Sequence, residues 1–451
     1  MKMLYRIEHA LWLVFLATLA FQSRFILWQA DVRFTEWRAG FLYVSDIVLA
    51  VLFVVAVFRL VHGWRPHGRP ASWEWALGVL AIIAVLSVGQ AAEPTVAWFA
   101  FARLVQGMLL YAYVRWYVRE QFGLDASVVA FTLGIAGQTV LGVAQFLLQH
   151  DVGLRTIGET VLDPRMRGVA VFYDLAGDKT LRAYGTLPHP NVLAVLIAFA
   201  GAAWAYLALR HSGASHRHAP HLWLGLMVLF TWGLMATFSR TVIAATLIAL
   251  AVPFVALFSE RIAHGWDRIA RLRMRARDLF LAIMAAMVTF VLFFWSQVFA
   301  RLGISMTEEA VVLRTFYNGR ALASGEGLWG INWTGAGVGN FVSWLMEANP
   351  HLPAWQYQPA HNLYLLVYTE LGVLGFAALG AFLVLLCRQL WRRRTQEPLV
   401  GIGLLSLVGF VLFIALFDHF FWTLHQGRIL WWLFWGVIAA YATASEVRNT
   451  K

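Results

Sequence analysis

The stretch TVIAATLIALAVPFVALF, residues 241–258, contains no charged side chain. A helix rises 1.5 Å per residue, so about 20 apolar residues of this kind cross the roughly 30 Å hydrocarbon core of a bilayer. Comparable runs recur along the whole chain, which is 60% hydrophobic and only 13% charged. A soluble protein carries about twice that charge fraction. Because a backbone in lipid must satisfy its hydrogen bonds internally, the sequence predicts an all-α, polytopic membrane helical bundle.

About twelve transmembrane helices are predicted. The first is interpreted as a signal anchor, because further spans follow it. The predicted spans cover residues 9–28, 41–61, 74–91, 96–114, 126–148, 187–209, 221–238, 241–258, 279–299, 361–387, 398–417 and 428–445. They predict three domains. Residues 1–300 hold spans one to nine with a smaller outer loop at about 150–186, residues 301–360 form a large structured loop, and residues 361–451 hold spans ten to twelve with the tail.

The charge pattern predicts which side each loop faces. Basic residues gather in Arg261–Arg277 and in RQLWRRR, Arg388–Arg394. Cytoplasmic loops are enriched in Lys and Arg, so both termini are predicted to be cytoplasmic and both long loops to face outward. Topology and attraction to anionic lipid explain the net charge of +11, and no nucleic-acid partner is expected. The single cysteine, Cys387, excludes an intrachain disulfide, and no Cys/His spacing predicts a metal site.

The large outer loop carries its own structural signals. Its segment EEAVVLRTFYNGRALAS, residues 308–324, has Val312, Phe316 and Leu322 at helical spacing. This pattern predicts a helix that lies on the membrane surface or over a cavity. The turn GAGVGNF, residues 335–341, follows it. Glycines at such a turn let the backbone approach a ligand or another helix closely.

Four arginines are candidates for binding an anion on the outer side. Arg240 lies at a tight turn between two apolar spans, Arg314 and Arg320 lie on the loop helix, and Arg182 precedes the sixth span. Arg240 is either an interfacial arginine that helps to set a helix end or a phosphate ligand, because a guanidinium donates bidentately and stays charged. We hypothesise that these arginines converge on one anionic group.

His361 is the candidate for proton chemistry. It lies where the large loop re-enters the membrane, and a histidine that titrates near neutrality can act as a general base. The alternative is a structural histidine that caps the helix or binds a loop carbonyl. Glu370 lies nine residues further on, half a turn away on a helix, so we assign it to structure or helix pairing, with Gly372 and Gly375 allowing close approach.

Several nucleotide-binding and hydrolase motifs are absent. The sequence contains no Walker-type phosphate loop, no GxSxG and no HExxH. An enzyme that faces outward has no ATP, so it must take its energy from an activated donor.

Four segments together resemble the O-antigen ligase and polymerase superfamily, whose members handle polyprenyl-diphosphate-linked glycans. The segments are RAYGTLPHPNVLA (182–194), TFSRTVIAA (237–245), the run from LRTFYNGRAL (313–322) to GAGVGNF (335–341), and PAHNLYLLVYTELGVLGF (359–376). They occur in the order typical of the family and at matching places in the predicted topology.

The resemblance implies roles for individual residues. Arg240 and Arg314 match arginines that contact the donor diphosphate, and His361 matches the histidine proposed to activate the acceptor. The residues at other motif positions, taken here as substrate-binding, are Arg182, Asn191, Gly337, Gly339 and Asn362. The stretch after Arg314 is longer than usual in the family, which makes Arg320 a possible rival for the diphosphate.

The resemblance also implies a function. We expect an enzyme of a bacterial inner membrane with a periplasmic active site, which inverts the sugar and needs no metal or cofactor. Its expected partners are an undecaprenyl-diphosphate-linked glycan donor, a lipid A-core or glycan acceptor, and membrane lipids. A ligase of lipopolysaccharide biosynthesis is favoured. The alternatives are a polymerase of the same superfamily and, from other classes, a lipid or polysaccharide transporter (flippase) or a non-catalytic membrane scaffold.

Overall fold

The computed structural model describes residues 2–31, 34–62, 70–118, 121–211, 220–258, 266–303, 309–325 and 330–443. The chain divides into two compact units that interleave along the sequence. Unit 1 comprises Met1–Arg24, Tyr43–Trp64 and Phe122–Ile304, and unit 2 comprises Phe25–Leu42, Arg65–Gln121 and Ser305–Lys451.

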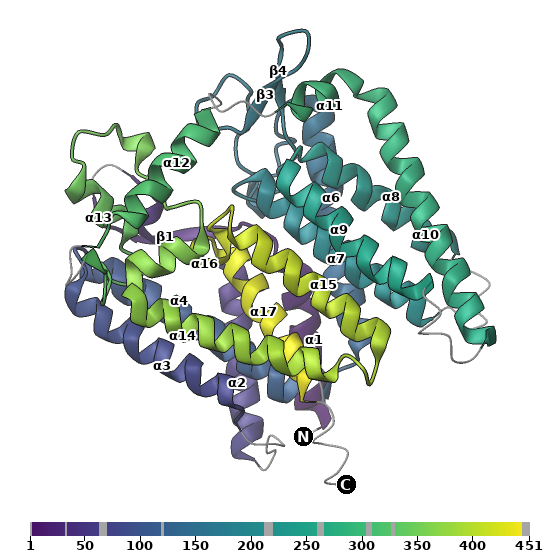
Figure 1. Cartoon of the computed structure of the whole chain (residues 1–451), viewed down its shortest axis with the longest axis horizontal. Helices are drawn as coiled ribbons and strands as arrows, with labels where there is room; N and C mark the ends of the chain where they lie inside the picture. The colour runs from purple at the N-terminus through teal and green to yellow at the C-terminus, as the bar shows by residue number, and fades with distance from the viewer. Residues whose placement is uncertain are drawn as a thin grey trace. The chain divides into compact units, whose positions relative to one another are not determined.

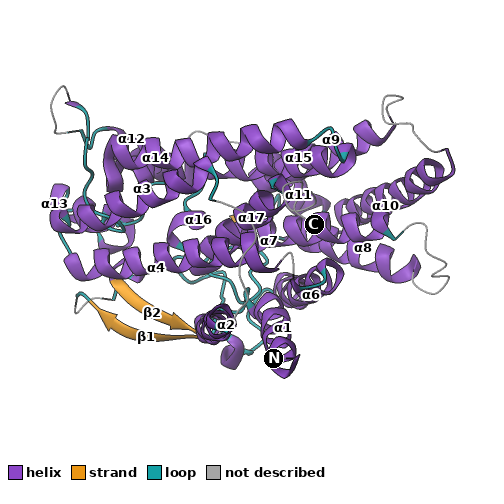
Figure 2. Ribbon diagram, turned by 90° about the horizontal axis from the view of Figure 1, so that it is seen from below, coloured by secondary structure: helices purple, strands orange, loops and turns teal. Residues whose placement is uncertain are grey.

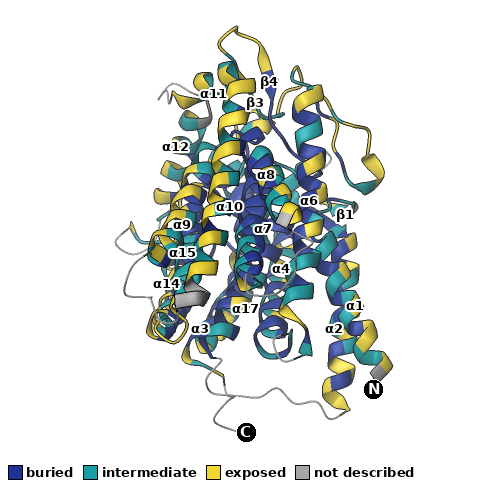
Figure 3. Cartoon of the chain, turned by 90° about the vertical axis from the view of Figure 1, so that its right-hand side faces the viewer, coloured by how far each residue is buried: buried dark blue, intermediate teal, exposed yellow. Residues whose placement is uncertain are grey.

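Unit 1 is a bundle in which α6 packs against α1, α7 and α8, and α8 packs against α10 (Figure 1). Helix α7 is the central element, and Figure 3 shows it almost wholly buried, whereas α10 exposes much of its surface. The elements are α1 (Lys2–Thr18), α2 (Val44–Val61), α6 (Leu124–Leu148), η4 (Arg155–Ile157), β3 (Val171–Tyr173), β4 (Lys179–Leu181), α7 (Pro190–Arg210), α8 (Pro220–Ala236), α9 (Arg240–Phe258), α10 (Trp266–Phe293) and α11 (Trp295–Leu302).

Unit 2 is built around α14, which packs against α3, α15 and α17, while α17 packs against α4. The strands β1 (Arg24–Gln29) and β2 (Ala39–Tyr43) pair with each other in a two-stranded sheet (Figure 2). The other elements are η1 (Glu36–Arg38), α3 (Ser72–Ser87), η2 (Val88–Gln90), α4 (Pro94–Tyr113), η3 (Val114–Val118), α12 (Glu309–Leu322), α13 (Phe341–Ala348), η7 (Ala354–Gln356), α14 (Leu363–Arg393), α15 (Pro398–Ala415), α16 (Phe420–Thr423) and α17 (His425–Ala442).

The helical, membrane-spanning character predicted from the sequence is confirmed. Nine helices among the described residues are long and apolar enough to cross a membrane. The predicted spans 221–238 and 428–445 correspond to α8 and α17, which are helical but lie outside this set of nine. The number of spans and the predicted orientation stay predictions.

The predicted span 9–28 has the wrong boundaries. Helix α1 already begins at Lys2 and ends at Thr18, and the apolar run after it forms strand β1, where Phe25, Ile26 and Leu27 are exposed. Aromatic and β-branched residues favour a strand, and hydropathy alone does not separate a short apolar strand from a helix. The polar residues just before the strand separate it from the helix, and the prediction did not take them into account.

A kink at Gly372 interrupts α14 and shapes unit 2. The backbone of Gly372 has φ 66° and ψ −173°, a conformation open essentially to glycine alone. The kink frees backbone groups of α14, and the loop before α13 satisfies them. Ala336 N–H donates to Thr369 O at 2.8 Å, and Val373 N–H donates to Asn332 O at 2.8 Å. Glycine at position 372 therefore allows the Gly-rich loop to dock on the helix.

Replacing Gly372 with alanine is expected to lower the midpoint of thermal unfolding. The new Cβ would lie 2.2 Å from Trp333 O, and the backbone conformation adds about 1–3 kcal/mol of strain. Gly380→Ala on the same helix is the matched control, because a Cβ there meets nothing within 4 Å. Circular dichroism of both purified variants against temperature measures the difference. Equal midpoints would contradict the structural role of the kink.

Candidate functional site

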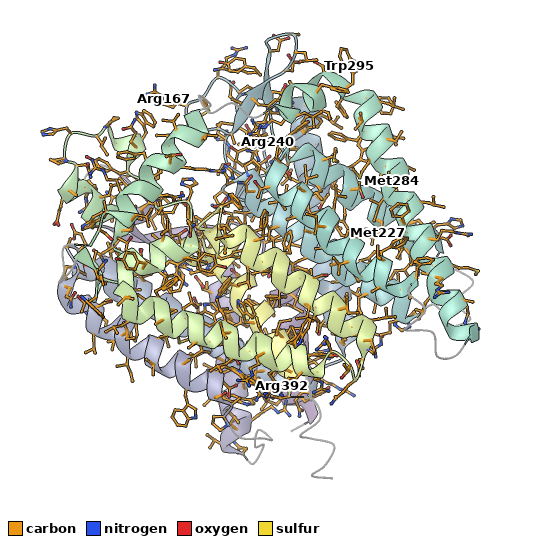
Figure 4. The ribbon with its side chains drawn as sticks, in the orientation of Figure 1. Arg167, Met227, Arg240, Met284, Trp295 and Arg392 are labelled. Atoms are coloured by element: carbon orange, nitrogen blue, oxygen red, sulfur yellow. The ribbon has the colours of Figure 1, made fainter. Side chains whose placement is uncertain are left out.

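In unit 1, Arg240 is the first residue of α9 and follows a strained turn (Figure 4). Phe238 in this turn has φ 47°, unusual for a residue other than glycine. The Arg240 guanidinium donates to Gly303 O at 2.5 Å and contacts Arg301 O at 3.4 Å. Arg240 is half-buried. Carbonyls at the C-terminal end of α11 therefore fix the direction of this cation.

Arg182 and Asn191 bind the turn that precedes Arg240. Arg182 Nε donates to Thr237 O at 2.6 Å, and its Nη2 donates to Asn191 Oδ1 at 2.8 Å. Ser239 Oγ donates to the same Asn191 oxygen at 2.9 Å. Both Arg182 and Asn191 are buried. These contacts position the N-terminus of α9. The substrate binding expected of the two residues stays a prediction.

Removing Arg182 is expected to destabilise unit 1. In Arg182→Ala the buried Thr237 carbonyl loses a donor, which costs about 1–3 kcal/mol. Arg155→Ala is the control, since Arg155 lies in the same long loop and is exposed. Thermal unfolding of the purified variants should show a lower midpoint for Arg182→Ala alone. A midpoint equal to that of the control would mean that the turn does not depend on Arg182.

In unit 2, aromatic rings from four segments meet around His361. We call Trp37, Arg314, Tyr317, His361 and His419 the His361 cluster. The Tyr317 ring stacks on the His361 ring, with centroids 5.7 Å apart and planes 18° apart. The His419 ring meets His361 edge to face at 4.9 Å, and Trp37 meets His419 edge to face at 5.5 Å. The half-buried His361 imidazole is thus held between two rings.

The electrostatics of the cluster link Arg314 to His419. Burial lowers the pKa of His419 below its usual range, and the charge of Arg314 lowers that pKa further, while Asp418 and Glu36 oppose the shift. Burial therefore favours the neutral form of the His419 imidazole. Burial also raises the pKa of Tyr317 to about 12, so its hydroxyl stays protonated.

Helix α12 confirms the helix predicted in the large loop. Tyr317 and Ala321 are buried, whereas Val312 and Leu322 are exposed. Arg314 is half-buried and lies one turn before Tyr317 on the helix. Arg320 is exposed and its guanidinium lies over the Phe316 ring at 5.5 Å. The spacing of apolar residues alone does not show which face of α12 is buried, because a tyrosine and an alanine form that face.

Asn362 caps the helix that follows His361. Its Oδ1 accepts hydrogen bonds from the backbone N–H groups of Tyr364 at 3.0 Å and Leu365 at 3.1 Å. Such a cap satisfies orphan donors in the first turn. Asn362 therefore fixes the start of α14 and, with it, the backbone of His361.

Glu370 joins the Gly-rich turn to α16. Its carboxylate accepts hydrogen bonds from Gly339 N–H at 2.9 Å and from Trp422 Nε1 at 2.8 Å. The role in structure assigned to Glu370 agrees with these contacts, although its partners are a turn and a short helix.

The glycines of the turn touch protein. Gly337 has φ 97°, and a Cβ there would lie 2.7 Å from Ala91 Cβ, while at Gly339 it would lie 2.4 Å from Ala100 Cβ. The close approach that these glycines allow is therefore toward η2 and α4. Gly375 is buried one turn beyond the α14 kink, against Leu371 of its own helix.

Residues 225–380 match the family model described as O-antigen ligase. Over this stretch the chain is similar to O-antigen ligases. The matched stretch includes Arg240, Arg314 and His361, whereas Arg182, Asn191 and His419 lie outside it. No curated protein matches the chain. Within the part of the chain that the structure describes, no group of three or more His, Cys, Asp or Glu side chains is arranged to hold a metal ion.

Sequence reasoning missed three members of the His361 cluster. Trp37 and His419 come from segments far from His361 in the chain, and Tyr317 was passed over on a helix that was otherwise predicted. A signal existed for one of them. The polar pair Asp418-His419 directly follows an apolar span, on the same predicted side as His361.

Proposed function

We propose that this protein transfers a glycan from undecaprenyl diphosphate to an acceptor hydroxyl, at the periplasmic face of a bacterial inner membrane. The observation that carries the proposal is the His361 cluster. There the half-buried His361 imidazole lies in ring contact with His419, whose pKa the charge of Arg314 lowers. The similarity to O-antigen ligases supports the substrate class, because members of this superfamily handle lipid-linked glycans.

In this mechanism His361 is the general base. The acceptor hydroxyl oxygen attacks C1 of the donor sugar, and its proton passes to the His361 imidazole. The bond between C1 and the diphosphate oxygen breaks, and the electron pair leaves with the polyprenyl diphosphate. Direct displacement of this kind inverts the configuration at C1. The reaction needs no ATP, because the diphosphate ester is already activated.

Arg314 stabilises the leaving group in the same mechanism. Negative charge grows on the diphosphate as the bond breaks, and a fixed guanidinium lowers the energy of that transition state. Arg314 is favoured over Arg320, whose guanidinium is exposed and packs on Phe316. We propose donor binding also for Arg240, which two backbone carbonyls hold at the start of α9.

The acceptor is proposed to be the core sugar of lipid A-core, which makes the enzyme a ligase. The test supplies the purified protein with a polyprenyl-diphosphate glycan and with either lipid A-core or a second lipid-linked glycan. Transfer to lipid A-core is the expected result. A ladder of products that grows without any core acceptor would identify a polymerase. Movement of intact donor across a vesicle membrane, without bond cleavage, would identify a transporter.

A further inference from the structure

The ring of His419 is anchored by a side chain of the short helix that follows it. Its Nδ1 lies 2.6 Å from Thr423 Oγ1, one turn further along the chain. The Thr423 hydroxyl also lies 3.3 Å from the His419 carbonyl oxygen. The short hydrogen bond between Nδ1 and Oγ1 fixes the plane of the His419 ring, whichever of the two groups donates.

The short helix that carries this anchor is itself tied to the core of unit 2. Trp422, next to Thr423, donates its indole N–H to the buried Glu370 at 2.8 Å. Glu370 also holds the Gly-rich turn through Gly339. His419 is 6% exposed and is therefore out of reach of a bulky glycan substrate. Its ring contacts the proposed base by edge-to-face packing on His361.

We propose that His419 is the positioning residue of the base: anchored by Thr423, it holds the His361 imidazole in the orientation that accepts the acceptor proton. This inference rests on the proposed glycan transfer. Tyr317 stacks on His361, and the perpendicular His419 ring limits rotation about the remaining axis. A base held in this way already has the reactive side-chain conformation. Misplacing it by about 1 Å would lower the rate by a factor on the order of 10².

The test breaks the anchor and leaves the rings in place. Thr423→Val keeps the size of the side chain and removes the oxygen that binds His419 Nδ1. Thr443→Val is the matched control, because Thr443 Oγ1 also donates to the carbonyl four residues earlier, at 2.9 Å, and that residue is Ala439. The kcat of Thr423→Val is expected to fall at least about tenfold, with the KM for donor and for acceptor unchanged. Thr423→Ser restores the hydroxyl and should restore kcat.

A second variant keeps the test decisive if Thr423→Val does not fold. His419→Phe preserves an aromatic ring of similar shape and removes the Nδ1 anchor, so its kcat should fall in the same way. Equal kcat values for Thr423→Val and Thr443→Val, or full activity of His419→Phe, would overturn the positioning role. A raised KM with unchanged kcat would also overturn it. If the wild-type protein transfers no glycan, the proposed function fails; if it transfers and these variants match it, the positioning role alone fails.

Discussion

His361→Ala is expected to lower the kcat of glycan transfer about 10³-fold, within the range of about 10² to 10⁴ that general-base catalysis contributes. The acceptor hydroxyl would then lose its proton to water, a poorer base in an incorrect position. The donor affinity should change little, because the proposed diphosphate contacts come from arginines. A kcat and KM measurement on purified protein separates the two effects.

His351→Ala is the matched control for this variant. His351 lies in the same long loop and is exposed, and it takes no part in the His361 cluster. Its replacement should leave kcat unchanged. Transfer by His361→Ala at the rate of the control would remove His361 from the mechanism.

Arg314→Ala is expected to lower kcat about 10²- to 10³-fold. This is the loss typical of removing one group that stabilises transition-state charge. Arg314→Lys should recover only part of the rate, since an ammonium keeps the charge but loses the planar, two-point contact with a phosphate. Arg320→Ala is the control on the same helix. Because Arg320 is exposed and rests on Phe316, this variant should keep nearly full activity.

The opposite ranking would change the assignment. A large loss in Arg320→Ala with a small loss in Arg314→Ala would transfer the diphosphate contact to Arg320. Equal, small losses in both variants would remove α12 from the donor site. Parallel binding measurements with the intact donor would show whether either arginine acts before the bond breaks.

Much of the fold was predictable because lipid imposes simple rules on a sequence. A run such as residues 241–258 has one stable form in a bilayer, and α9 occupies these positions almost residue for residue. The helix of the large loop was found from its period alone. Strand β1 was not predicted, because its apolar residues are too few to tell a strand from the end of a helix. Its partner strand β2 comes later in the chain, and the sequence does not show that the two segments pair.

The candidate site was predictable only in part. His361 and Arg314 stand out by residue type and place, and the structure links both to His419, one by ring contact and one by charge. A single sequence does not show which distant segments meet, so Trp37 and His419 stayed hidden. Nor does it show what a polar side chain binds, and Asn362 and Arg182 bind the protein's own backbone.

The central claim is that this protein breaks the bond between a glycan and a polyprenyl diphosphate and passes the glycan to a hydroxyl. The most direct measurement incubates the purified protein, in lipid nanodiscs and without ATP, with labelled donor and lipid A-core. It follows the release of polyprenyl diphosphate and the glycosylated acceptor in the same samples. The account predicts that both appear in equal amounts and that His361→Ala forms neither at a comparable rate. An unchanged donor with wild-type protein, or full transfer by His361→Ala, would contradict it.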